Sequence, residues 1–302
     1  MKQFLISLQA WKCHPSSSNF RPLMPFTFEP CSPSAKSYFS SSSQRYSSSL
    51  EKGSANSLNS ENAEVSMQRF WKTVDIEKLP DGQYSIRLDM RRLKTPNGNQ
   101  LLVPKSKLVL ATLISREWDE QRKVLKQHSL PLVSLVSRAI DGMNSSDKVL
   151  VIEGLIKYLD TDTIWFSQSE PATLAKMQAK HWDPLINWIK DTYGVEIETH
   201  RDSIFFSKQP ESTKTKLKAV VEGFDPLKLA AFERAVHTTK SFVISLALIE
   251  GRLTIEEASD ASRVEVLSQI LRWGEVEDSH DVDYQEIRMK LGSVVCAGIN
   301  TI

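Results

Sequence analysis

The residues best suited to metal chemistry are a histidine and two aspartates at His280, Asp281 and Asp283. Imidazole and carboxylate groups bind divalent cations, and Asp160 and Asp162 could supply further carboxylates to such a site. Together these residues would predict a metal-dependent hydrolase. The pattern is incomplete, because no histidine lies in an HExxH motif or at zinc spacing from a cysteine. Both segments also have the residue types of turns and helix N-caps, so the hydrolase is the alternative hypothesis.

Other catalytic and cofactor motifs are absent from the sequence. It has no GxGxxG or GxxxxGK[ST] loop for phosphates and no GxSxG elbow for a nucleophilic serine. Cys13 and Cys31 lie near the N-terminus, and Cys296 has no base beside it in the sequence. We therefore expect no enzyme activity, no cofactor and no bound nucleotide. A single thiol in the body of the chain fits a reducing compartment.

The segment 240–283 is rich in helix signals but contains no reactive group. Thr254 and Glu257 have the spacing of a capping box, and Gly251 and Gly274 are typical helix stops. A segment with this many helix signals and no reactive group favours a role in binding another protein.

Glu265 is the residue of this segment that we expect to contact a partner. It projects toward Ala258 and Ser262, whose small side chains leave room for close approach. From the spacing alone, a solvated glutamate paired with Arg272 is the favoured interpretation. The helix would be held in place by an apolar stripe formed by Val264, Leu267 and Leu271.

The tryptophans divide into two groups. Helical spacing predicts core positions for Trp118, Trp182 and Trp188. Trp273 differs because it lies beside a helix stop and before an acidic stretch, so we expect it at the rim of a surface.

Residues 68–128 combine a period-two pattern with a helical one. Apolar residues alternate with polar ones from Tyr84 to Met90, which predicts a strand between turns at 80–82 and 96–99. Strands are also expected at 70–76 and 101–103. A helix should follow, with its buried face formed by Leu108, Ala111, Ile114, Trp118 and Leu125. The expected N-terminal domain is a small antiparallel sheet with one helix.

Residues 130–302 read as a mainly helical domain, so the fold class is α+β. Helices are expected at 132–140 and 147–159. Asp183 should cap a helix that Gly194 ends, and Asp225 a long helix that Gly251 ends. A further helix would run from Thr254 to Gly274, and a final one from Asp281 to Leu291.

The first 60 residues have the composition of a transit peptide. They contain 17 serines and six basic residues against two acidic ones. We expect this leader to be disordered, and its composition fits a mitochondrial or a chloroplast destination. The rest of the chain has a net charge of −3, which offers no attraction for nucleic acid or an anionic membrane. No apolar run is long enough for a membrane span, so a soluble body is expected.

Several short segments together resemble the mitochondrial assembly chaperones for the alpha subunit of ATP synthase. The resemblance extends from about residue 70 to residue 291, nearly the whole body. The matching segments are Arg69–Lys72, Leu88–Pro96, Glu117–Asp119, Pro131–Leu132, Arg138–Asp141, Tyr158–Thr163, Trp182–Leu185, Lys240–Glu250, Ala261–Glu265, Trp273–Gly274 and His280–Asp281.

The resemblance implies a fold, a function and a location. The helical domain is expected to be an orthogonal bundle. The protein is expected to bind the unassembled alpha subunit in the mitochondrial matrix, shield its subunit interface from aggregation and pass it to the beta subunit. The glutamate of the family's S-R-x-E motif is functionally important, which implies a functional role for Glu265. The tryptophan of the E-W-D motif is implied to be structural, and here it is Trp118. Further candidate client-binding residues are Arg263, Ser262, Ala258 and Trp273. A permanent accessory subunit of the synthase is a third hypothesis.

Overall fold

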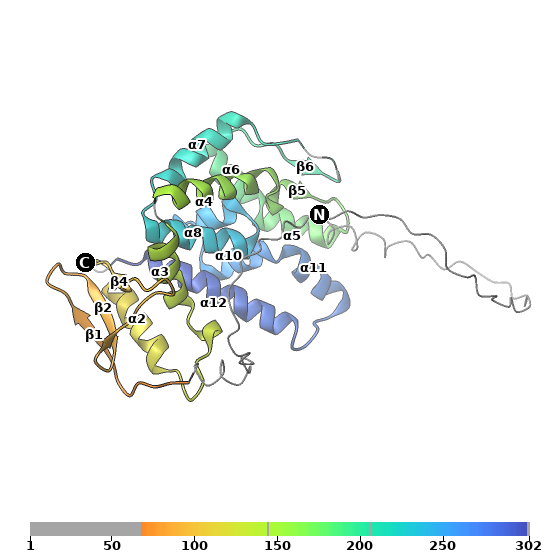
Figure 1. Cartoon of the computed structure of the whole chain (residues 1–302). Coiled ribbons are helices and arrows are strands. Elements are labelled where there is room, and N and C mark those ends of the chain that lie inside the picture. The colour runs from red at the N-terminus through yellow and green to blue at the C-terminus, as the bar shows by residue number, and fades with distance from the viewer. Residues whose placement is uncertain (1–67, 144, 204, 206, 301–302) are drawn as a thin grey trace, which may run out of the picture. The chain divides into compact units, whose positions relative to one another are not determined.

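The structure is a computed structural model that describes residues 68–143, 145–203, 205 and 207–300, all within one compact unit (Figure 1). The predicted transit peptide at residues 1–60 lies outside the described residues. An antiparallel sheet comes first and helices follow, which confirms the predicted α+β class. The predicted boundary between two domains near residue 129 stays a prediction.

The sheet is built around β2, at Tyr84–Leu88, in the middle of the order β1-β2-β3. β2 pairs antiparallel with β1 (Val74–Lys78), β3 (Arg91–Arg92) and β4 (Leu102–Val103). Positive φ angles at Gly82 and Gly98 confirm the two predicted turns. The first strand begins four residues later than expected.

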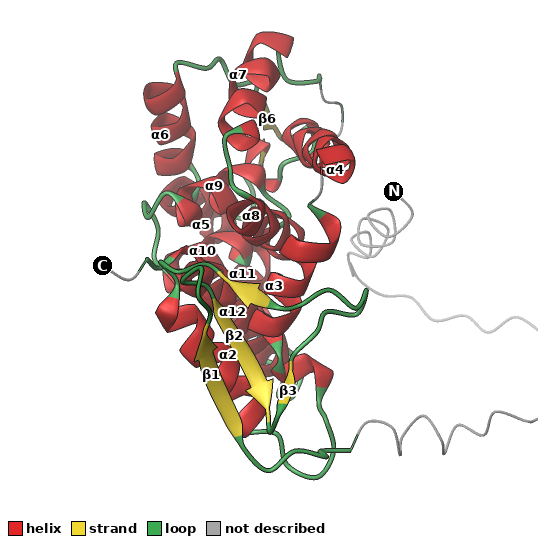
Figure 2. Cartoon of the chain, turned by 60° about the vertical axis from the view of Figure 1, so that its left-hand side comes forward, coloured by secondary structure: helices red, strands yellow, loops and turns green. Residues whose placement is uncertain are grey.

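Helix α2, at Leu108–Asp119, covers one face of this sheet (Figure 2). Ile86 and Leu88 of β2 are buried beneath it, as their alternation predicts. Met90 does not continue that face: β2 ends at Leu88, Asp89 takes a left-handed conformation, and Met90 is 86% exposed. The expected helical face is correct at its centre and wrong at its ends, where Leu108 is exposed and Leu125 lies beyond the helix.

The rest of the described chain is mainly helical. Its helices are α3 (Pro131–Gly142), α4 (Ser145–Lys157), α5 (Ala172–His181), α6 (Asp183–Tyr193), α7 (Glu211–Glu222), α8 (Pro226–Thr239), α9 (Phe242–Ile249), α10 (Ile255–Ser262), α11 (Val264–Trp273) and α12 (His280–Gly298). Short 3₁₀ turns are η2 (Gln127–Ser129), η3 (Tyr158–Asp160) and η4 (Thr163–Trp165), and a small parallel pair joins β5 (Phe166–Ser167) to β6 (His200–Arg201).

The centre of the helical part is α8, which packs against α12, α3 and α9. The sequence predicted one helix from Asp225 to Gly251, and the cap at Asp225 is confirmed. The helix nevertheless breaks at Lys240, which has a φ of 59°, and Ser241 caps the new helix α9. Seven of the eight residues of α9 are buried. This part of 240–283 is therefore core, because a helix that is apolar on all sides must be enclosed.

Asp162 holds the N-terminus of α9 from outside that helix. Its buried carboxylate accepts hydrogen bonds from the Phe242 amide at 2.7 Å and the Val243 amide at 3.1 Å. Its other oxygen accepts from the Ile164 amide at 3.3 Å, which caps η4. The N-cap interpretation of this aspartate is confirmed. Burial raises its pKa to about 6, although these hydrogen bonds and one from Ser241 oppose the rise.

Several helix boundaries differ from expectation. Helices α5 and α7 were not predicted, because few apolar residues mark their buried sides. α5 runs almost directly into α6, so Asp183 is inside a helix and does not cap it. The expected helix from Thr254 to Gly274 is broken at Arg263 into α10 and α11, although its capping box and its glycine stop are confirmed. Asp281 lies inside α12 and is not its cap.

Glu117 joins α2 to α3. Its two carboxylate oxygens accept hydrogen bonds from the Leu132 amide at 2.8 Å and the Val133 amide at 3.0 Å. Arg234 of α8 lies nearby and donates to the Pro131 carbonyl. Burial raises the pKa of Glu117 to about 7, against the opposing effects of the two amides and Arg234.

We predict that Asp162→Asn destabilises the protein by about 1–3 kcal/mol, since one amide oxygen must replace two carboxylate acceptors in a buried site. Urea unfolding at pH 7 measures this loss. The matched control is Asp225→Asn, an exposed cap that uses a single oxygen, for which the loss should be smaller. Equal losses in the two variants would contradict the central role of Asp162.

We predict a pH-dependent contribution from Glu117. Its pKa in the folded chain is above its ordinary value of 4.5, so its stabilisation is complete below that value and is lost as the pH rises through about 7. The loss is at most about 3 kcal/mol. Urea unfolding at pH 5 and pH 8 should show a smaller fall in unfolding free energy for Glu117→Gln than for the unmodified chain. Glu120→Gln, at an exposed position of the same segment, should retain the full fall.

Candidate functional site

The second half of α11 and the loop after it are exposed. The buried residues of α11, Val264 and Ser268, both lie in its first half. Every residue from 271 to 279 is exposed. Three apolar side chains in this run reach solvent: Leu271 is 71% exposed, Trp273 62% and Val276 59%. We call these three side chains and Glu265 of α11 the α11 surface; helix α11 is labelled in Figure 1.

The position of Trp273 confirms its expected exposure, whereas that of Leu271 does not fit the predicted buried stripe. Leu271 lies two turns after Val264, on the same side of the helix. Only the first half of that side is covered, because α11 packs on α5 and α10 near its beginning. The sequence pattern predicts an amphipathic helix, but it does not show how far along that helix its apolar side is covered by other helices.

Glu265 is exposed as a residue, yet its carboxyl group lies among protein atoms that raise its pKa. Desolvation is the physical cause. Within the described part of the chain, Glu265 makes no hydrogen bond or ion pair that would offset this cost, and the expected pair with Arg272 is not formed. An acid in this condition is well placed to gain from an incoming cation or amide donor.

The predicted neighbours of Glu265 divide between the surface and the interior. Ala258 is completely buried and Arg263 is 6% exposed, so neither side chain is open to a partner. Ser262 is half-buried, and its hydroxyl donates to the Ser259 carbonyl at 2.8 Å. Of the five candidate residues, Glu265 and Trp273 are exposed, Ser262 is half-buried, and Ala258 and Arg263 are buried.

Trp182 and Arg263 position the start of α11. The Trp182 indole Nε1 donates to the Ala261 carbonyl at 2.8 Å, at the end of α10. The Arg263 guanidinium lies 4.9 Å from the ring centroid of Tyr284 and donates to the His280 carbonyl at 3.4 Å. These contacts hold the break between α10 and α11 against α5 and α12. Sequence reasoning missed this role, since the partners are distant in the chain.

The alternative metal site is not formed. The described residues contain no group of three or more His, Cys, Asp or Glu side chains that could hold a metal ion. His280 Nδ1 accepts from the Val276 amide at 3.0 Å, and Asp160 accepts from the Gln209 amide and Lys214. Burial raises the pKa of the half-buried Cys296, which disfavours a reactive thiolate.

Other residues of the matching segments connect separate parts of the chain through hydrogen bonds and ring contacts in the N-terminal part. Arg69 donates to the Asp119 carbonyl, and its guanidinium lies 5.4 Å from the centroid of Trp71. Trp71 packs edge-on against Trp118, which is buried as expected. Asp141 of α3 accepts from Thr95 Oγ1 at 2.7 Å and from two asparagines of the second turn. These contacts give the residues of the matching segments a structural role within the chain.

The chain is similar to known proteins in both sequence and fold. The model of the family described as ATP12 chaperone protein matches residues 68–190. The crystal structure of Atp12 from Paracoccus denitrificans superposes with a TM-score of 0.68 at 27% identity, over 78% of this chain and all of that one. The fold is therefore that of a chaperone.

Two curated relatives identify the family. The mitochondrial protein atp12 of Schizosaccharomyces pombe is 37% identical over 237 residues, which cover 76% of this chain and 81% of the relative. The mitochondrial protein ATP12 of Saccharomyces cerevisiae is 30% identical over 270 residues and is covered to 83%. The chain belongs to the ATP12 chaperone family, which confirms the resemblance seen in the sequence. None of the described helices is long and apolar enough to cross a membrane.

We predict that Trp182→Phe loosens α11 without unfolding the protein. The variant loses the bond to the Ala261 carbonyl, at a cost of about 1–2 kcal/mol. Amide hydrogen exchange should increase across α10 and α11. Trp188→Phe is the matched control, because Trp188 is half-buried in α6 and its indole makes no hydrogen bond within the described chain. Unchanged exchange in Trp182→Phe would contradict the positioning role.

Proposed function

We propose that this protein is an assembly chaperone for mitochondrial ATP synthase that binds the unassembled alpha subunit. It would shield the subunit interface of alpha from aggregation and pass alpha to the beta subunit. Membership of the ATP12 family supports the proposal, as does the sequence resemblance to alpha-specific chaperones. The single observation that carries it is the α11 surface, where exposed Leu271 and Trp273 accompany Glu265, which has no ion-pair partner among the described residues.

A surface of this composition suits transient protein binding. Exposed tryptophan and leucine side chains supply apolar contact area, and aromatic residues often dominate interface energies. Glu265 adds specificity, because a partner that offers a cation or an amide removes the cost of its partial desolvation. An unassembled subunit exposes an apolar interface of its own, so a temporary cover limits its aggregation.

Release requires no chemical step in this proposal. If the chaperone occupies part of the alpha surface that beta later takes, then beta displaces it by competition. The lack of any phosphate-binding motif in the sequence is consistent with a mechanism independent of nucleotide.

The proposed location is the mitochondrial matrix. The curated relatives are named mitochondrial proteins, and the Ser-rich, basic first 60 residues fit a transit peptide.

Co-expression tests the proposed client directly. The chain is expressed with tagged alpha or with tagged beta, and the fraction recovered on each tag is measured. We expect the chain to be recovered on tagged alpha but not on tagged beta. Adding beta to the complex with alpha should release the chain. Equal recovery with alpha and beta, or with neither, would contradict client specificity. Recovery with the mature synthase instead of free alpha would favour a permanent accessory subunit.

We predict that Glu265→Lys weakens binding to alpha at least fivefold, equivalent to about 1 kcal/mol. The Tm should not fall, because Glu265 has no partner to lose within the described part of the chain and its raised pKa means that the charge is unfavourable in the folded chain. Calorimetric titration and thermal unfolding measure the two effects. Gln269→Lys, one turn later at an exposed position, is the matched control and should bind normally. A large drop in Tm would instead show that Glu265 is structural.

A further inference from the structure

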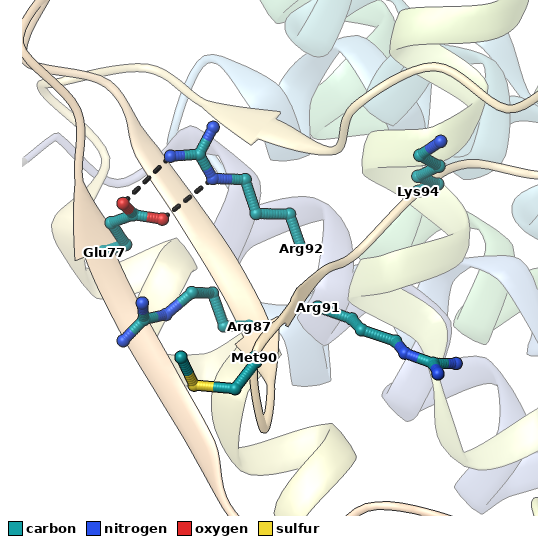
Figure 3. A pocket seen from close by; sticks show the side chains of 6 residues that line it. All are labelled: Glu77, Arg87, Met90, Arg91, Arg92 and Lys94. Atoms are coloured by element: carbon teal, nitrogen blue, oxygen red, sulfur yellow. Dashed lines mark hydrogen bonds and ion pairs between the residues drawn. The ribbon is translucent and has the colours of Figure 1, made fainter.

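The sheet carries a strongly basic hollow that the proposed contacts of α11 do not use. It has a volume of about 670 Å³ and lies over β1, β2, β3 and the turn between the last two (Figure 3). Four cations and one acid line it, so its net charge is +3, in contrast to the net negative charge of residues 61–302. Its lining side chains are Glu77, Arg87, Met90, Arg91, Arg92 and Lys94. We call this the basic hollow.

The backbone of this turn forces the cations together. Asp89 has a φ of 53°, and its carboxylate accepts the Lys72 and Thr73 amides at 2.9 Å each. The tight turn places Arg87 directly across from Arg92 in the register of β2 and β3. Like charges in such a pair destabilise a sheet. Two acids of β1 offset part of this repulsion, because Asp75 lies across from Arg87 in the register and Glu77 bonds Arg92.

The charge of the basic hollow is only partly neutralised from within. Glu77 accepts two hydrogen bonds from Arg92, each 2.9 Å long. Among the described residues, Arg87, Arg91 and Lys94 form no ion pair. The Nε of Arg87 is enclosed by protein and has no acceptor. An incoming anion could therefore pair with the charged groups of these three cations, although the enclosed Nε of Arg87 is not open to it.

We propose that the basic hollow docks an acidic segment of the client protein. Carboxylates would bind Arg87, Arg91 and Lys94, while an apolar side chain packs on Met90, whose exposed thioether adapts to varied shapes. Figure 3 shows Met90 beside Arg87, with Arg91 and Lys94 extending on the other side of the turn. The docked segment must therefore span several residues. The identity of the client, but not the chemistry of the hollow, rests on the proposed function.

The lining favours an acidic peptide over nucleic acid or an anionic membrane. Glu77 lies among the arginines and repels an uninterrupted row of phosphates, whereas a peptide can place its carboxylates on either side of it. None of the six lining residues is aromatic, so no base can stack there.

The test measures the Kd of the full chain for unassembled alpha at 50 mM and 300 mM NaCl. We expect the double variant Arg91→Glu, Lys94→Glu to bind roughly tenfold more weakly at low salt, with a smaller difference at high salt. Both positions are exposed, and neither forms an ion pair with another described residue. The matched control reverses two exposed cations elsewhere, Arg122→Glu with Lys157→Glu, and should not change the Kd.

A second variant acts in the opposite direction. Glu77→Gln removes the acid and frees Arg92, so binding should tighten by roughly two- to fivefold. Because misfolding does not tighten binding, this result supports docking at the hollow independently. An unchanged or weaker Kd would count against it.

The outcomes separate this proposal from the proposed function. Binding of alpha with an unchanged Kd in all variants would overturn the basic hollow and leave the proposed function intact. If alpha does not bind at all, a labelled synthetic peptide of alternating Glu and Leu tests the hollow alone by fluorescence anisotropy, with the same variants. Charge-dependent binding of duplex DNA or phosphatidylserine vesicles, without binding of the peptide, would overturn the choice of partner.

Discussion

The buried carboxylate of Asp162 is the contact on which the helical part depends. Helix α9 is enclosed on all sides, so the amides at its first turn cannot be satisfied by water. Asp162 satisfies the Phe242 and Val243 amides from a turn 80 residues earlier in the chain. The charge is favoured by the N-terminus of the helix and opposed by burial, and burial raises its pKa. Helix α9 in turn packs against α8, the central helix of this part.

Within the segments that resemble the family, some residues hold the fold together and other residues are open to a partner. Trp182, Arg263 and Asp141 each connect elements that are far apart in the sequence. They place α11 and the sheet turns without facing a partner themselves. Glu265, Arg91 and Lys94 have the reverse character, because no ion pair among the described residues compensates their charges. Uncompensated charge that costs stability is what an interaction surface requires.

The α11 surface and the basic hollow offer complementary kinds of contact. The first is apolar with one acid, and suits short-range packing against an exposed subunit interface. The second is cationic and open, and suits the attraction of an acidic segment before close contact forms. A chaperone that must release its client gains from such a division, since many moderate contacts can be displaced one at a time.

The sequence by itself determined the local structure: the β2 alternation, the turns at Gly82 and Gly98, the Asp225 cap, the Thr254–Glu257 capping box and the exposure of Trp273. These signals act within a few residues, so they can be read without the fold. The tertiary structure decided where helices break at Lys240 and Arg263, why α9 is core, and which side of α11 stays open. It also brought Asp162 to α9 and Glu117 to α3, where burial changes their pKa values. Those features depend on contacts between distant segments, and local patterns of residues do not encode which segments will cover one another.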